Sequence, residues 1–193
     1  MEDRPRIAAP RRPIAVGCGL VALAVFLVVS VVVFAVIFFE SGADTGQVRL
    51  DAAEAYAIGS VEFIGARNFY IIRLSPREFI ALSDLDAVNR ANVQRRCRVI
   101  PVAPTDPSLP GLLNRFSSLT SPGARGSTLL FREACNGAVY DVTGLRLDGE
   151  GANLERYPVS FSPDGHLRVD VSRRQCTLRD GADFFAPIPC GPR

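Results

Sequence analysis

A long uncharged apolar run near the N-terminus is the feature that most constrains how this chain can fold. No charged residue occurs from Ile14 to Phe39. A helix of that length would be roughly 39 Å long, more than the ~30 Å hydrocarbon core of a bilayer. A cleaved signal peptide has an apolar region of only about 7–15 residues. The run therefore predicts an uncleaved transmembrane anchor over residues 14–39, in contact with the lipid bilayer.

The charges that flank this run predict its orientation. The residues before it include the arginines Arg4, Arg6, Arg11 and Arg12. The residues after it begin with Glu40 and include Asp44. By the positive-inside rule, residues 1–13 are expected to be a cytoplasmic tail, and the C-terminal domain is expected to be extracytoplasmic. The paired arginines also leave export by the twin-arginine route open. The expected location is the cell membrane, with a single pass.

The charged and titratable residues exclude several classes of function. The chain has 193 residues and a formal net charge of only +2, so a nucleic-acid partner is not expected. All of its basic side chains are arginines, which excludes a Schiff-base lysine and a phosphate-binding loop lysine. The single histidine, His166, has no neighbouring residues that would complete a Ser/His/Asp set. These exclusions favour a non-enzymatic protein and leave an enzymatic activity open.

The remainder of the chain predicts a mostly β domain over residues 59–172, reached through a polar tether at residues 40–58. β-Branched and aromatic residues predict a hairpin, a third strand and a closing hairpin. These strands are expected at 61–64, 68–74, 78–84, 159–161 and 167–171. Residues 103–126, rich in proline and serine, are expected to be a long insertion. Residues 173–193 would form a C-terminal extension.

The cysteines indicate disulfides rather than a metal centre. Cys18 lies in the apolar run, and the other four show no C-x-x-C spacing. Those four cysteines are Cys97, Cys135, Cys176 and Cys190. The short segment between Cys176 and Cys190 predicts that these two are joined. Because disulfides persist outside the cytosol, this usage agrees with an extracytoplasmic domain.

The stretch from Phe131 to Gly144 reads F-R-E-A-C-N-G-A-V-Y-D-V-T-G. It resembles the second cluster-binding loop of the Rieske 2Fe–2S family, F-x-C-P-C-H-G-S-x-F-D-x-x-G. Upstream, the segment from Asn92 to Cys97 stands where the family has C-P-H-x-G-C. The resemblance covers about residues 59–172 and is to the membrane-anchored, cytochrome bc-type branch. It implies a Rieske-like antiparallel β-sandwich, and a disulfide between Cys97 and Cys135 that braces the two loops.

The iron-ligand positions depart from this family pattern. A Rieske centre needs two thiolates and two imidazoles. The positions that carry these ligands in the family are occupied here by Asn92, Gln94, Glu133 and Asn136. The resemblance therefore implies a scaffold without its cluster, and we expect no cofactor and no bound metal. The alternative is a Rieske-type 2Fe–2S electron-transfer protein, an oxidoreductase, with non-standard ligands.

Three further interpretations concern individual side chains. Cys97 and Cys135 could form a redox-active dithiol. Zinc could be bound by those two cysteines with Glu133 and His166. The carboxylate pairs Asp84/Asp86 and Glu150/Glu155 are expected to be solvated loop charges.

An arginine-rich segment is the candidate for contact with a partner. Arg90, Arg95, Arg96 and Arg98, together with Arg132, could dock an acidic protein or lipid head groups. The expected function is thus a structural or interaction subunit of a membrane complex, such as a respiratory one.

Overall fold

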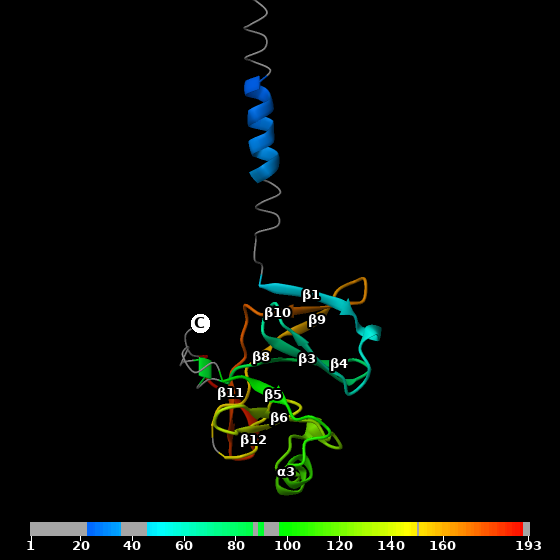
Figure 1. Ribbon diagram of the computed structural model, residues 1–193, viewed down its shortest axis with the longest axis vertical. Coiled ribbons are helices and arrows are strands. Elements are labelled where there is room, and N and C mark those ends of the chain that lie inside the picture. The colour runs from blue at the N-terminus through cyan, green and yellow to red at the C-terminus, as the bar shows by residue number, and fades with distance from the viewer. Residues whose placement is uncertain (1–22, 36–45, 87–88, 91–96, 150, 191–193) are drawn as a thin grey trace, which may run out of the picture. The chain divides into compact units, whose positions relative to one another are not determined.

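The computed structural model describes residues 23–35, 46–86, 89–90, 97–149 and 151–190 (Figure 1). The chain divides into two compact units, Met1–Thr45 and Gly46–Arg193.

The N-terminal unit differs from the predicted transmembrane anchor. Its described part is a helix over residues 23–35, drawn in blue in Figure 1. Among the residues that the structure describes, no helix is long and apolar enough to cross a membrane. The fold class with a transmembrane helix over 14–39 was therefore wrong, and the single-pass topology has no support. Residues 1–22 and 36–45, including the expected cytoplasmic tail, lie outside the described residues.

The C-terminal unit consists mainly of antiparallel strands, which confirms the mostly β prediction (Figure 1). The strands are β1 (Gln47–Ala52), β2 (Val61–Ile64), β3 (Phe69–Ser75), β4 (Glu78–Ser83), β5 (Val99–Pro101), β6 (Leu130–Glu133), β7 (Val139–Asp141), β8 (Arg156–Tyr157), β9 (Val159–Phe161), β10 (His166–Asp170), β11 (Thr177–Asp180) and β12 (Asp183–Pro187). The helical elements are η1 (Ala53–Ala55), α3 (Leu109–Phe116) and η2 (Pro122–Ala124). The strands pair in the orders β1-β10-β9, β2-β3-β4-β8, β5-β6-β7 and β11-β12.

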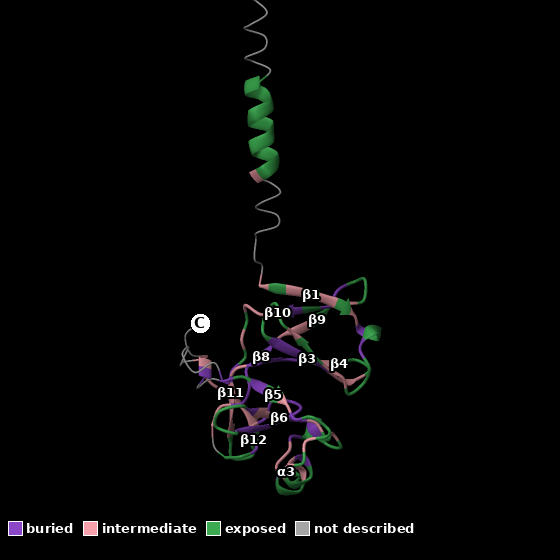
Figure 2. Cartoon of the chain, in the orientation of Figure 1, coloured by how far each residue is buried: buried purple, intermediate pink, exposed green. Residues whose placement is uncertain are grey.

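Strand β3 is the centre of the fold, because both of its faces are buried (Figure 2). Side chains alternate between the two faces of a strand. Phe69 and Ile71 pack against Leu167 and Val169 of the β1-β10-β9 sheet. On the opposite face, Tyr70 and Ile72 belong to the cluster that includes Phe131 and Tyr140 of the β5-β6-β7 sheet. The β2-β3-β4-β8 sheet is thus the middle of three stacked layers.

A fourth layer covers the outer face of the β5-β6-β7 sheet. Leu130 and Val139 alternate with the inward-facing residues of β6 and β7 and pack with Leu109 and Phe116 of α3. The predicted insertion therefore carries a helix that packs back on the domain. The C-terminal part of this insertion is held by the buried carboxylate of Asp141, which accepts a hydrogen bond of 2.8 Å from the backbone N–H of Ser121.

The folded unit extends beyond the predicted domain at both ends. Strand β1 pairs with β10, from Gln47 opposite Asp170, so part of the expected tether belongs to the sheet. In the expected extension, the β11-β12 hairpin is tied to the domain by Asn153. Its side-chain amide donates to the hydroxyl of Thr177 (3.0 Å) and to the carbonyl of Phe184 (2.9 Å).

Candidate functional site at the bridged loops

Two loops meet beside the β5-β6-β7 sheet. The first joins β4 to β5, and the second joins β6 to β7. Val99 of β5 lies opposite Glu133 of β6, which brings the ends of both loops together. Cys97 and Cys135 form a disulfide across them with a Cα–Cα distance of 5.6 Å, as the resemblance implied. We call Cys97, Glu133 and the residues from Ala134 to Ala138 the bridged tip.

Glu133 holds the second loop in shape. Its side chain is buried at the end of β6. One carboxylate oxygen accepts a hydrogen bond of 2.7 Å from the backbone N–H of Cys135, and the other accepts one from the N–H of Asn136. The N–H of Gly137, which has a φ of +75°, donates to the Glu133 carbonyl (3.1 Å). The carboxylate therefore substitutes for solvent at amides that the turn would otherwise leave without acceptors.

The residues at the family's ligand positions do not fit a Rieske-type cluster. Glu133 offers a carboxylate and Asn136 an amide, and neither supplies the thiolate or imidazole that a Rieske centre needs. Asn92 and Gln94 lie outside the described residues. His166 lies on β10, where its Nδ1 is 2.9 Å from the carbonyl oxygen of Leu50. A Rieske cluster needs two imidazole ligands, and this sequence contains one histidine.

Three of the four residues considered for zinc come together at the bridged tip. Ligand atoms of Cys97, Glu133 and Cys135 all lie within 4.8 Å of one another. His166 does not belong to this group. The two sulfur atoms are bonded to each other, so neither is a free thiolate in this state.

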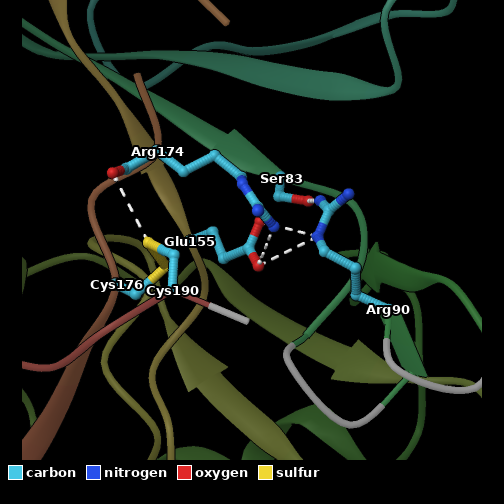
Figure 3. Close-up of a disulfide and its surroundings, with 6 residues drawn as sticks. All are labelled: Ser83, Arg90, Glu155, Arg174, Cys176 and Cys190. Carbon is cyan, nitrogen blue, oxygen red and sulfur yellow. Dashed lines mark hydrogen bonds and ion pairs between the residues drawn. A yellow bond between two sulfur atoms is a disulfide. The ribbon is translucent and has the colours of Figure 1, made fainter. Parts of the chain in front are cut away.

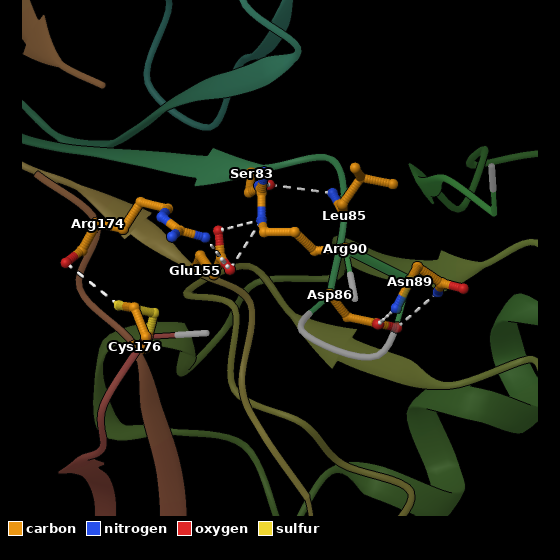
Figure 4. A network of polar contacts seen from close by, with 9 residues as sticks. Ser83, Leu85, Asp86, Asn89, Arg90, Glu155, Arg174 and Cys176 are labelled. Atoms are coloured by element: carbon orange, nitrogen blue, oxygen red, sulfur yellow. Dashed lines mark hydrogen bonds and ion pairs between the residues drawn. A yellow bond between two sulfur atoms is a disulfide. The ribbon is translucent and has the colours of Figure 1, made fainter. Parts of the chain in front are cut away.

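The start of the first loop is fixed by a buried carboxylate, Asp86 (Figure 4). It accepts hydrogen bonds from the backbone N–H of Asn89 (2.8 Å), from that residue's side-chain amide (3.0 Å) and from the hydroxyl of Tyr140 (3.2 Å). Burial raises the pKa of Tyr140, and the negative charge of Asp86 raises it further. Tyr140 thus stays a neutral hydrogen-bond donor that links the loop to β7.

A second buried carboxylate, Glu155, joins three segments (Figure 3). The Nε of Arg90 lies 2.9 Å from one of its oxygens and 2.8 Å from the other. Nη1 of Arg174 lies 3.2 Å away. Arg90 also donates to the hydroxyl of Ser83 (2.8 Å). This network connects the first loop, the residue before β8 and the C-terminal extension, where Cys176 and Cys190 form the expected second disulfide.

Asp84, Asp86 and Glu155 are all buried, so the expectation of solvated loop charges was wrong for them. Glu150 lies outside the described residues. One sequence signal was available: Arg90 and Arg98 lie in the same loop segment as two of these carboxylates. Glu155 and Arg174 are distant in sequence from that segment, and no local pattern connects them.

The arginines expected to dock a partner differ in their surroundings. Arg90 is bound internally to Glu155 and Ser83. Arg98 is about half exposed; its Nε lies 3.3 Å from Asp84, and Nη2 donates to Asn68 (3.1 Å). Burial raises the pKa of Asp84, an effect that the positive charge of Arg98 partly opposes. Arg132 pairs with Asp106 (3.1 Å). Arg95 and Arg96 lie outside the described residues.

Comparisons with known proteins assign no family. No protein-family model and no curated relative matches the chain. Among solved structures, the chain is similar to a putative NADH-dependent nitrite reductase small subunit from Mycobacterium tuberculosis, with 15% sequence identity and a TM-score of 0.35. The match covers 64% of this chain and 92% of that one. At this TM-score the similarity supports no inference about function.

Proposed function

We propose that the C-terminal unit is a Rieske-like domain without an iron–sulfur cluster, and that it works as a structural or binding module. The observation that carries this proposal is the role of Glu133. At a position where the family has a thiolate, its carboxylate accepts hydrogen bonds from the loop's own amides. The two bridged loops at the ends of antiparallel strands agree with the architecture that the sequence resemblance implies.

The two disulfides favour an oxidising compartment as the place where this module acts. An extracytoplasmic location is the proposal that fits them best. In that setting, the Cys97–Cys135 bond restrains the two loops, a role that a bound cluster has in the family. The chain-entropy model gives such a long closed loop roughly 4 kcal/mol of stabilisation.

The partner we propose is an acidic surface on another subunit of a larger protein complex. The half-exposed Arg98 next to the bridged tip supports this choice, and the sequence places Arg95 and Arg96 in the same loop. Clustered positive charge attracts acidic partners and accelerates their association at low salt.

Iron and acid-labile sulfide analysis, together with an EPR spectrum of the reduced protein, tests the absence of a cluster. We expect neither iron nor sulfide in stoichiometric amount and no Rieske-type signal. A stoichiometric cluster would overturn the proposal and would establish the electron-transfer alternative with non-standard ligands.

Charge reversal tests the docking surface. The full-length protein is captured from native extracts with and without the triple change Arg95→Glu, Arg96→Glu and Arg98→Glu. The matched control is Arg125→Glu, at an exposed position after η2. We expect co-purifying subunits to be lost from the triple variant and retained by the control. Retention of the same subunits by both proteins would contradict docking through these arginines.

A further inference from the structure

The bridged tip combines two kinds of metal-binding atom at short range. The sulfur atoms of Cys97 and Cys135 and a carboxylate oxygen of Glu133 lie within 4.8 Å of one another. Cys97 and Glu133 are buried, whereas Cys135 is exposed. The group is therefore enclosed by protein on one side and accessible to solvent on the other.

The backbone that carries these atoms is held in place without the disulfide. Val99 pairs with Glu133 across β5 and β6, and the N–H of Ala134 donates to the carbonyl of Arg98 (3.0 Å). The N–H of Glu133 donates to the carbonyl of Ala138 (2.8 Å). These bonds fix the strand ends from which the side chains project. Opening the sulfur–sulfur bond would leave the ladder intact, so the ligand atoms would stay close together.

Two backbone hydrogen bonds fix the orientation of the Glu133 carboxylate and leave it able to bind a metal. A carboxylate offers about four lone-pair positions, and the N–H groups of Cys135 and Asn136 occupy one on each oxygen. A position remains on each oxygen for a cation. Metal-binding carboxylates are commonly oriented by hydrogen bonds of this kind, which contribute to metal affinity.

We propose that reduction of the Cys97–Cys135 disulfide turns the bridged tip into a zinc site formed by two thiolates and the Glu133 carboxylate. Thiolates favour zinc over magnesium or calcium. Zinc is generally four-coordinate, and a site with three protein ligands leaves one position for water. The exposed side at Cys135 supplies access for that water.

The zinc site forms in two steps, reduction of the disulfide and binding of the metal. A dithiol reductant gives two electrons and two protons to the disulfide, which yields two protein thiols, while the reductant becomes a disulfide itself. Zinc then displaces the two thiol protons, which are released to solvent. Zinc also neutralises charge, since two thiolates beside the Glu133 carboxylate repel one another without a cation. The site thus binds metal only in the reduced state.

The second disulfide provides an internal comparison. Among the described residues, Cys176 and Cys190 belong to no group of potential metal ligands. Sγ of Cys190 instead lies 3.5 Å from the carbonyl oxygen of Arg174 (Figure 3). Reduction there exposes two thiols without a carboxylate partner, so metal binding is expected at one disulfide and not at the other.

Cobalt(II) titration of the full chain tests the proposal, with Cys18→Ser as the common background and a phosphine as reductant. We expect the reduced protein to bind one cobalt ion with a thiolate charge-transfer absorption, and zinc to displace it. The oxidised protein should show no such absorption. Cys97→Ser with Cys135→Ser should abolish the absorption, and Cys176→Ser with Cys190→Ser should retain it. Glu133→Gln should weaken cobalt affinity tenfold or more.

Three results would overturn the proposal. They are no absorption in the reduced protein, equal absorption after loss of Cys97 and Cys135, and unchanged affinity in Glu133→Gln. Circular dichroism covers the case in which reduction unfolds the chain, because metal binding is linked to folding. Restoration of the fold by zinc would support the site, and failure to restore it would refute the site. These outcomes are independent of the iron and sulfide analysis that tests the proposed function.

Discussion

Replacement of Glu155 by glutamine is the sharpest test of how the domain is held together. The Glu155 side chain is 3% exposed, and its two arginine partners, Arg90 and Arg174, are 23% and 9% exposed. Glutamine keeps the size of the side chain but removes the negative charge. It therefore removes the negative charge that two largely buried guanidinium groups share (Figure 4).

The expected magnitude follows from this burial. Removing one partner of a buried ion pair costs about 3–5 kcal/mol, because the remaining charge stays desolvated. The lower end applies here, since Arg90 is partly exposed and keeps its hydrogen bond to Ser83. We expect Glu155→Gln to lower the free energy of unfolding by about 3 kcal/mol. A domain of this size has about 5–15 kcal/mol in total, so the loss would be large.

Urea unfolding with both disulfides intact measures this loss, provided that the slope with denaturant is unchanged. Asp164→Asn serves as the control, because Asp164 and Arg49 form an ion pair in which both side chains are more than half exposed. Exposed pairs contribute little to stability, so the control should unfold close to the wild-type midpoint. A loss below about 1 kcal/mol in Glu155→Gln, or one equal to the control, would refute the role of the network.

Three further variants test other parts of the structure by urea unfolding. Asp84→Asn should raise stability at neutral pH, because burial holds the pKa of Asp84 above its usual value of 3.8. In the wild-type protein, ionisation of the buried Asp84 lowers the free energy of unfolding as pH rises from 3.8 through the raised pKa of the folded state. Below pH 3.8 the carboxyl is neutral in both states, so the stabilities of the two proteins should converge there. Gly144→Ala should cost about 1–3 kcal/mol, since Gly144 has a φ of +83° and an added Cβ would lie 2.9 Å from Leu82 Cδ2. Cys176→Ser with Cys190→Ser should cost about 3 kcal/mol in the chain-entropy model.

Each of these variants has an outcome that contradicts its argument. Asp84→Asn would do so by being less stable than wild type at neutral pH, which would show that the ion pair with Arg98 outweighs burial. Gly144→Ala would do so by unfolding at the wild-type midpoint. The double serine variant would do so by retaining full stability. Because this variant keeps the Cys97–Cys135 disulfide, it reports on the second disulfide alone.

Local sequence patterns determined much of the β architecture. The hairpin of β2 and β3, strand β4 and the closing pair β9 and β10 lie close to where alternation and turn residues predicted them. The Cys176–Cys190 disulfide agrees with the prediction from its short spacing, and the Cys97–Cys135 disulfide agrees with the pairing that the family resemblance implied. Glycine and proline turns, together with alternating apolar residues, act over a few residues, so they can be interpreted without knowledge of the rest of the fold.

The uncharged run shows where hydropathy alone misled. An apolar composition over residues 14–39 predicted a spanning helix, but the helix of the described residues covers 23–35. Hydropathy reports how favourable burial of a segment would be, and it does not by itself place a helix.

Only the tertiary structure decided the role of the charged residues. In the sequence, Glu155 and Asp86 are ordinary acidic residues between turn signals. In the fold, each is buried and bound to partners, some of them more than fifty residues away, such as Tyr140 for Asp86. The sequence by itself determined which atoms were available: one histidine, too few for a Rieske centre, and cysteines able to pair. Packing decided which of those atoms meet, because the cost of burying a charge depends on what surrounds it in three dimensions.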